Sequence, residues 1–175
     1  EYLKCAKDPA YFMKKYCYIQ HPTRGRILFN LYPFQDKILH LFKDNQYNIV
    51  LKSRQLGIST LSAAYSLWLM VFHKDKNVLA LATTQATARN LVTKVIFMYD
   101  QLPKWLRLPS VEKNKLSLRL KNGSRIAAKS SNADAARSEA VSLLLIDEAA
   151  FIDNIDETFT AAQQTLATGG QCLAL

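Results

Sequence analysis

Cysteines are scarce in this sequence, and long hydrophobic runs are absent. The three cysteines, Cys5, Cys17 and Cys172, are odd in number and share no Cys-x-x-Cys or Cys/His spacing. We therefore expect no disulfide framework and no structural zinc site, and we do expect a reducing intracellular compartment. The longest apolar stretch, residues 63–72, is interrupted by Ser66 and falls short of the ~20 residues that span a bilayer. No signal peptide is visible, so neither secretion nor membrane insertion is expected.

The composition is that of one globular domain, with 175 residues of which 49% are hydrophobic and 21% are charged. A net charge of +9 favours polyanionic partners. The charge is unevenly distributed, because residues 103–139 carry nine basic and three acidic side chains, whereas residues 140–175 carry five acidic side chains and no lysine or arginine. An acidic segment inside a basic protein suggests a site that binds a metal ion together with phosphate.

The hydrophobic pattern alternates between strands and helices. The predicted helices span residues 11–18, 34–42, 59–72 and 85–101, and the predicted strands span residues 47–51, 77–82 and 143–146. A turn is predicted between the first two helices, and an antiparallel hairpin over residues 116–128, around Asn122-Gly123. This order predicts an α/β fold with a mostly parallel sheet between helices and the hairpin inserted at its edge. Ligands of such sheets bind at the carboxyl ends of the strands.

A polar loop connects the first predicted strand to the helix that follows it, where backbone N–H groups and a helix N-terminus favour phosphate binding. Its sequence resembles the pattern G-x-x-x-x-G-K-[ST] but has Lys52 at the first glycine and Ile58 at the lysine. Lys52 and Arg54 are candidates for the missing positive charge, and Ser59, or alternatively Thr60, for the Mg²⁺ ligand. The candidate loop residues are Lys52, Ser53, Arg54, Gln55, Leu56, Gly57, Ile58, Ser59 and Thr60. An ordinary exposed turn remains the alternative.

The apolar run at residues 143–146 ends in Asp147 and Glu148, which is the form of a Walker B element. Adjacent carboxylates at the end of a buried strand repel each other, and a cation nearby relieves that repulsion. Asp147 is therefore a candidate metal ligand, and Glu148 a candidate for polarising a water molecule. The alternative is a strand that ends in solvated acidic residues.

Tyr32, Phe34 and Gln35 precede the first predicted strand. An aromatic ring there is able to stack on a purine while the Gln35 amide reads its edge in a bidentate manner. Alternatively, Tyr32 and Phe34 are core residues and Gln35 is a surface amide at the start of a helix.

Taken in order, the aromatic-Gln pair, the loop without its usual lysine and the segment Ile-Asp-Glu-Ala-Ala-Phe-Ile at residues 146–152 resemble the ATPase domain of tailed-bacteriophage large terminase subunits. The resemblance covers nearly the whole chain. It implies a three-layer P-loop NTPase fold of the additional-strand, catalytic-glutamate (RecA-like) class. It also implies ATP hydrolysis that drives double-stranded DNA into a procapsid, with ATP and Mg²⁺ bound and Lys52 as the displaced base of the loop.

The same resemblance implies further roles and partners. Arg137 resembles the arginine that terminases insert into the next subunit, although an ordinary surface arginine is the alternative. Expected partners are double-stranded DNA, a homo-oligomeric ring on a portal protein and a small terminase subunit, in the cytoplasm of an infected or prophage-carrying bacterium, with no membrane. We expect residues 1–175 to be the ATPase domain, truncated before the coupling motif and without the nuclease domain, and therefore without DNA cleavage.

Two other functions remain open on the sequence. A helicase-like motor has a similar core but is expected to keep a lysine where Ile58 stands. A non-hydrolysing nucleotide- or DNA-binding module is expected if the altered loop signals lost activity. The basic hairpin is either a contact for DNA phosphates or a solvated surface.

Overall fold

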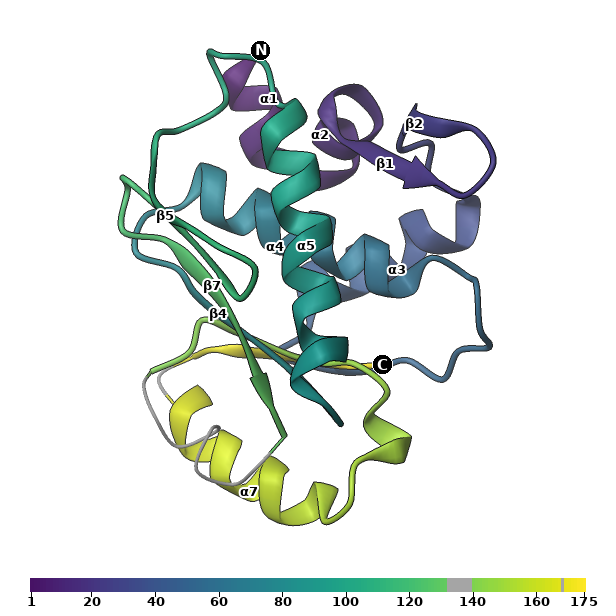
Figure 1. The fold of residues 1–175 in the computed structure, drawn as a ribbon, viewed down its shortest axis with the longest axis vertical. Coiled ribbons are helices and arrows are strands. Elements are labelled where there is room, and N and C mark those ends of the chain that lie inside the picture. Colours follow the sequence, from purple (N-terminus) through teal and green to yellow (C-terminus); the bar gives the residue numbers. More distant parts are fainter. Residues whose placement is uncertain (132–139, 168) are drawn as a thin grey trace.

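The structure is a computed structural model that describes residues 1–131, 140–167 and 169–175 (Figure 1). Its strands in the large sheet are β3 (Tyr47–Ile49), β4 (Asn77–Ala82), β5 (Ser110–Lys113), β6 (Ser117–Leu120), β7 (Arg125–Ser130), β8 (Leu143–Ile146) and β9 (Gln171–Ala174). Among the described residues this sheet has seven strands, in the order β3-β9-β8-β4-β7-β6-β5. The first four pairs in that order are parallel, and β6 is antiparallel to β7 and β5. The sheet is therefore mostly parallel with an antiparallel edge, as the sequence predicts.

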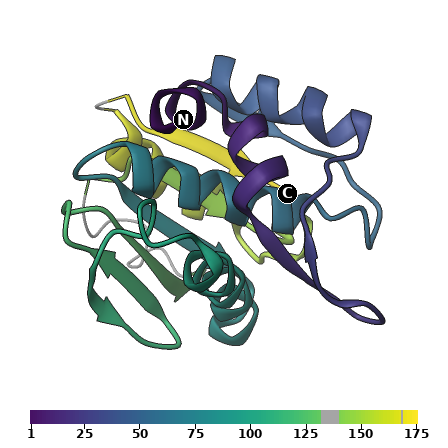
Figure 2. The same ribbon diagram turned by 90° about the horizontal axis from the view of Figure 1, so that it is seen from above.

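Helices cover both faces of the sheet (Figures 1 and 2). One face carries α1 (Tyr2–Lys7), α2 (Pro9–Tyr16), α3 (Pro33–Asp44), α4 (Ile58–Phe72) and α5 (Gln85–Gln101), and the other carries α7 (Ile155–Leu166). Figure 2 shows α4 between α3 and α5. A separate antiparallel hairpin is formed by β1 (Tyr18–His21) and β2 (Gly25–Leu28).

The two-sided cover explains why the central strands are apolar throughout. In β4, Val78 and Ala80 belong to the core beneath α4 and α5, whereas Leu79 and Leu81 belong to the core that includes α7 residues. Alternate side chains of a strand point to opposite faces, so a strand covered on both sides needs apolar residues at every position. All four residues of β8 are buried for the same reason.

Helix α4 is buried around almost its whole circumference, as expected for a helix without a polar face. It packs between its neighbours, and its Trp68 Nε1 donates a hydrogen bond of 2.8 Å to the carbonyl oxygen of Cys5. Helix α4 therefore fixes α1 to the same core.

The structure corrects several element predictions. The predicted turn between the first two helices is the β1–β2 hairpin, which turns through Gly25 at φ +66°. The predicted helix over residues 11–18 is α2, which starts earlier because Asp8 caps it, its side chain accepting a hydrogen bond from the Tyr11 N–H at 3.0 Å. The first predicted strand is shorter, although the Val50 N–H still donates to the carbonyl oxygen of Ala174. Elements α1, β5, α7 and β9 were not predicted as such.

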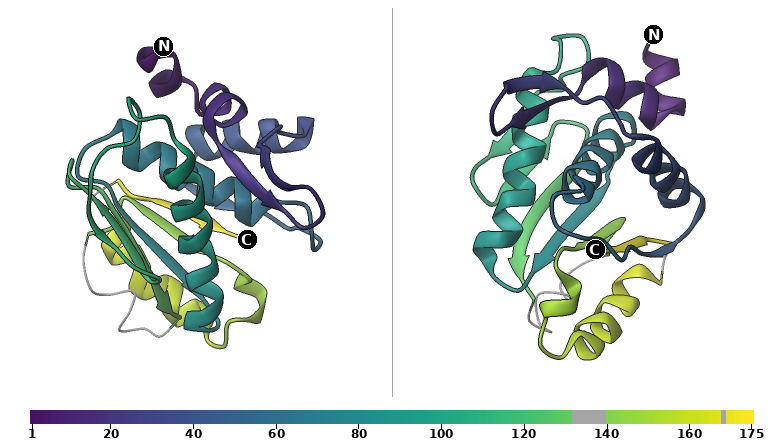
Figure 3. Two further views of the ribbon diagram at one scale, coloured as in Figure 1. Left: turned by 45° about the horizontal axis from the view of Figure 1, so that its top comes forward. Right: turned by 90° about the vertical axis from the view of Figure 1, so that its right-hand side faces the viewer.

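The parallel strands place their carboxyl ends at one edge of the sheet. Ile146 at the end of β8 pairs with Leu81 of β4 and with Ala174 of β9, and Ala174 pairs with Ile49 of β3. The chain segments after β3 and β8 therefore leave the sheet at the same edge (Figure 3). Of the helices that the structure describes, none combines the length and the apolar character that a bilayer-spanning segment requires.

Candidate functional site

The loop between β3 and α4 forms a turn of unusual backbone conformation. Gln55 has φ +66°, and Gly57, the N-cap of α4, has φ +73°. Within the described part of the chain, the backbone N–H groups of residues 53–55 make no hydrogen bond to protein acceptors. Together with the unpaired N–H groups of the first helical turn, they form a surface suited to an anion.

The segment after β8 presents Asp147 and Glu148. The backbone N–H of Asp147 donates to the carbonyl oxygen of Leu81 at 2.9 Å, which fixes the residue at the sheet edge. Its side chain is buried, and its Oδ1 accepts a hydrogen bond from the Glu148 N–H at 3.1 Å. Glu148 itself is exposed, in the left-handed conformation at φ +56°, where the 3₁₀ turn η1 (Ala149–Phe151) begins.

The loop and the acidic segment meet through three side chains. Lys52 Nζ lies 3.0 Å from Ser59 Oγ and 3.1 Å from Asp147 Oδ1, and Ser59 Oγ donates to Asp147 Oδ1 at 3.0 Å. An ammonium group therefore bridges a hydroxyl and a carboxylate, the position in which a metal cation would be attracted. The structure brings these three predicted residues together.

The oxygen donors at this point fit Mg²⁺, with the Lys52 ammonium standing in for the cation. Asp147 offers a carboxylate and Ser59 a hydroxyl, and both are hard ligands. Among the described residues, no cluster of three or more His, Cys, Asp or Glu side chains is suited to a metal. Asp147 and Ser59 would suit Mg²⁺ if waters or phosphate oxygens completed its coordination, because Mg²⁺ usually takes one or two protein ligands together with such oxygens.

A cavity of about 730 Å³ lies next to the loop. Its walls are the β1–β2 hairpin, the segment leading into α3, Lys94 of α5 and the loop, including Lys52, Ser53, Gln55, Leu56, Gly57, Ile58, Ser59 and Thr60. Arg54 is exposed and is not part of the wall. Ile58, at the position of the usual loop lysine, is only 2% exposed and belongs to the core.

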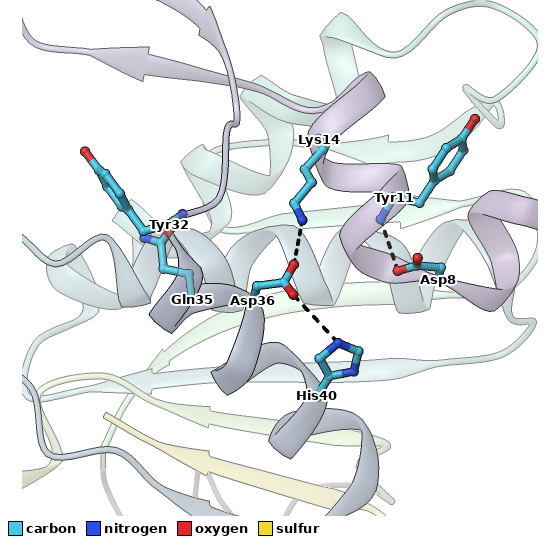
Figure 4. Close-up of polar contacts among 7 residues, drawn as sticks. All are labelled: Asp8, Tyr11, Lys14, Tyr32, Gln35, Asp36 and His40. Atoms are coloured by element: carbon cyan, nitrogen blue, oxygen red, sulfur yellow. Dashed lines mark hydrogen bonds and ion pairs between the residues drawn. The ribbon is translucent and has the colours of Figure 1, made fainter.

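Gln35 is a buried structural link rather than a surface amide. Its side chain is 2% exposed, its Oε1 accepts from the Tyr32 N–H at 3.0 Å, and its Nε2 donates to the carbonyl oxygen of Leu56 at 2.9 Å. Figure 4 shows Gln35 turned back toward Tyr32 at the start of α3. Because the amide oxygen is already engaged, the predicted bidentate contact with a purine is not preformed. The amide instead ties α3 to the loop.

Tyr32 and Phe34 are not core residues, which corrects one of the two interpretations of the sequence. Tyr32 is 64% exposed and stacks on Phe34, with ring centroids 5.7 Å apart and an interplanar angle of 7°. Of the two, only Tyr32 lines the cavity.

Helix α3 is held by an ion pair of 2.7 Å between Asp36 and Lys14 of α2, which also appears in Figure 4.

Two parts of the cavity wall were missed by sequence reasoning. The β1–β2 hairpin is too short to give a pattern distinct from a turn. Lys94 had a detectable signal, because it lies three residues after Leu91 and four before Met98, in the buried stripe of α5. Burial lowers the pKa of the Lys94 ammonium; the Asp147 carboxylate opposes that shift, and the Lys52 charge adds to it. Arg137, the predicted finger, lies outside the described residues.

The chain matches one protein family and is similar to several solved structures. Residues 49–172 match the family described as "Terminase large subunit, T4likevirus-type, N-terminal". The crystal structure of the HK97 bacteriophage large terminase is similar with a TM-score of 0.75 and 19% identity, covering 97% of this chain and 36% of that one. The Thermus phage P74-26 large terminase ATPase domain is similar with a TM-score of 0.68 and 18% identity, covering 83% of this chain and 64% of that one.

A third structure is that of the large terminase from a thermophilic bacteriophage in complex with ADP. It has a TM-score of 0.64 and 16% identity, and the match covers 83% of this chain and 38% of that one. The chain therefore spans little more than a third of the length of two of these three proteins. The predicted P-loop fold, of the terminase ATPase type, is confirmed.

Proposed function

This chain belongs to the terminase large subunit family, and from that membership we propose that it binds ATP with Mg²⁺ and hydrolyses ATP to drive double-stranded DNA into a viral procapsid. The observation that carries the proposal is the contact of Lys52, Ser59 and Asp147 within 3.0–3.1 Å, in which Lys52 and Ser59 also line the cavity. This contact supports one shared site for triphosphate and metal. A large terminase of similar fold has been crystallised with ADP and with ATP-gamma-S, which supports the choice of nucleotide.

In the proposed binding mode, the N–H groups of residues 53–59 surround the phosphates. Lys52 leaves Asp147 and pairs with a phosphate oxygen, so that Asp147 and Ser59 become free to hold Mg²⁺. The metal neutralises charge on the β- and γ-phosphates when it is bound. Tyr32 stacks on the base from the cavity wall, and Gln35 keeps the loop in place.

Glu148 is the proposed general base. It is exposed beside Asp147, and its side chain makes no hydrogen bond or ion pair with any residue that the structure describes. It accepts the proton of a water whose oxygen attacks the γ-phosphorus. The bond from that phosphorus to the β–γ bridging oxygen breaks, and its electron pair leaves with ADP. The products are ADP and inorganic phosphate.

The wider assembly is proposed from the family. It comprises a homo-oligomeric ring on a portal protein, a small terminase subunit and double-stranded DNA, in the cytoplasm of a bacterial host. Arg137 is proposed to act in the neighbouring subunit, and the chain is proposed to form an ATPase domain.

The test of this function is the release of inorganic phosphate from MgATP, measured with and without double-stranded DNA. Glu148→Gln is expected to reduce turnover by about 10²–10⁴-fold while ATP still binds. Glu157→Gln, an exposed glutamate of α7, is the matched control and is expected to leave turnover unchanged. ATP binding without turnover in the unsubstituted protein assembled on its portal would instead favour a non-hydrolysing module.

A further inference from the structure

Lys94 stands in the wall of the same cavity as the loop, although it comes from α5. It shares the cavity with Lys52, Ser59 and Thr60. It also lines a smaller cavity of about 380 Å³, between the β1–β2 hairpin and α5, to which Thr60 contributes as well. Helix α5 packs against both α4 and β1, and Lys94 lines the cavity together with the loop residues.

The Lys94 ammonium makes no hydrogen bond or ion pair with any residue that the structure describes. By contrast, Lys52 has two such partners. The Asp147 carboxylate acts on Lys94 only by its charge, which opposes the lowering of the Lys94 pKa, whereas it forms an ion pair with Lys52. A half-buried cation without a partner is unfavourable for the free protein, so its presence in a cavity wall points to an anionic ligand.

The loop also lacks charge where a P-loop normally provides it. Ile58 replaces the usual lysine and is buried in the core, and Arg54 does not line the cavity. In the described part of the chain, the lysine and arginine residues that line this cavity are Lys52, Lys94 and Arg24, of which Arg24 is an exposed residue in the turn between β1 and β2. A triphosphate carries several negative charges that basic groups normally neutralise at the β- and γ-phosphates.

We infer that Lys94 is a second phosphate ligand, which contacts the terminal phosphates of bound ATP and supplies the charge that Ile58 cannot. Ser59, the proposed Mg²⁺ ligand, lines the same cavity as Lys94, which assigns Lys94 to the metal end of the triphosphate. The inference rests on the proposed function, since it concerns the same site. It makes α5 part of the nucleotide-binding machinery, beside the loop itself.

The test compares the dissociation constants of ATPγS and ADP by calorimetry for Lys94→Met, Lys94→Arg and Arg89→Met. Methionine keeps an unbranched side chain but removes the charge, and arginine keeps the charge. Arg89 is an exposed basic residue on the same helix and serves as the control position. We expect Lys94→Met to weaken ATPγS binding about tenfold or more, with a smaller loss for ADP. Lys94→Arg should recover most of the affinity, and Arg89→Met should bind as the unsubstituted protein does.

The melting temperature of the nucleotide-free protein separates this role from a structural one. Lys94→Met should melt at the same temperature or higher, because it removes an unpaired charge. Unchanged ATPγS affinity in Lys94→Met, or a loss in Lys94→Arg equal to that in Lys94→Met, would overturn the inference about Lys94 and leave the proposed function standing. Failure of the unsubstituted protein to bind ATPγS would overturn the proposed function together with it.

Discussion

Lys52 Nζ lies 3.1 Å from Asp147 Oδ1, although the two residues are 95 positions apart in the sequence. The contact joins the loop after β3 to the segment after β8, and it exists because parallel strands end at the same edge of the sheet. In this contact the Lys52 ammonium neutralises the Asp147 carboxylate that is proposed to hold Mg²⁺. On the proposed function, we expect MgATP binding to replace the Lys52 ammonium at Asp147 with Mg²⁺.

The two basic residues of the loop are expected to differ in importance. Lys52→Met should weaken ATPγS binding about tenfold or more, because Lys52 lines the cavity, whereas Arg54→Met should weaken it less than about threefold, because Arg54 is exposed and does not line the cavity. Equilibrium dialysis with labelled ATPγS measures both. A larger loss in Arg54→Met than in Lys52→Met would reverse the assignment of the principal phosphate ligand.

Gly57 is expected to be sensitive even to alanine. Its φ is +73°, and an added Cβ would lie 2.8 Å from Gln35 Nε2, which is held by the carbonyl oxygen of Leu56. Gly57→Ala should lower the free energy of unfolding in urea by about 1–2 kcal/mol from the backbone alone. In the double variant with Gln35→Ala, the loss of unfolding free energy should be smaller than the sum of the losses in the two single variants, because the clash is then removed. If the two single losses added fully in the double variant, the added Cβ at Gly57 would not clash with Gln35.

The three cysteines are expected to be unreactive in the folded protein. All three are buried, and burial raises the pKa of the Cys172 thiol to about 12 and that of Cys17 well above its ordinary value. The thiolate is the reactive form, so a thiol reagent at pH 8 should label the native protein only at the rate of unfolding. Denatured protein should react at all three positions. Rapid labelling of native protein would contradict the buried placement.

His73 is expected to make stability depend on pH just below neutrality. Burial and the Lys76 charge lower its pKa from 6.5, so the unfolded chain binds the proton more strongly. The free energy of unfolding should therefore fall as the pH drops below about 6.5. This part of the slope should be absent in His73→Gln when urea unfolding is followed between pH 7.5 and 5.5. If the slope of unfolding free energy against pH were unchanged in His73→Gln, the pH dependence would belong to other groups.

The sequence allowed the prediction of those features that follow from strand order. Asp147 and Lys52 were placed together because an apolar strand must be covered on both faces and must end at the ligand-binding edge. The spacing of Lys94 from Leu91 and Met98 indicates its place in the buried stripe of α5, but its position at the cavity beside the loop depends on how α5 packs. The β1–β2 hairpin and the burial of Gln35 likewise depend on tertiary contacts, such as the Leu56 carbonyl oxygen that binds the Gln35 amide.

The central claim is tested most directly by a crystal structure of the protein with ATPγS and Mg²⁺. We expect the phosphates to lie on the N–H groups of residues 53–59, with Lys52 Nζ moved from Asp147 to a phosphate oxygen and Mg²⁺ bound to Ser59 Oγ and Asp147. A nucleotide bound elsewhere, with the contact between Lys52 and Asp147 intact, would contradict the claim that these two segments form one site for metal and triphosphate.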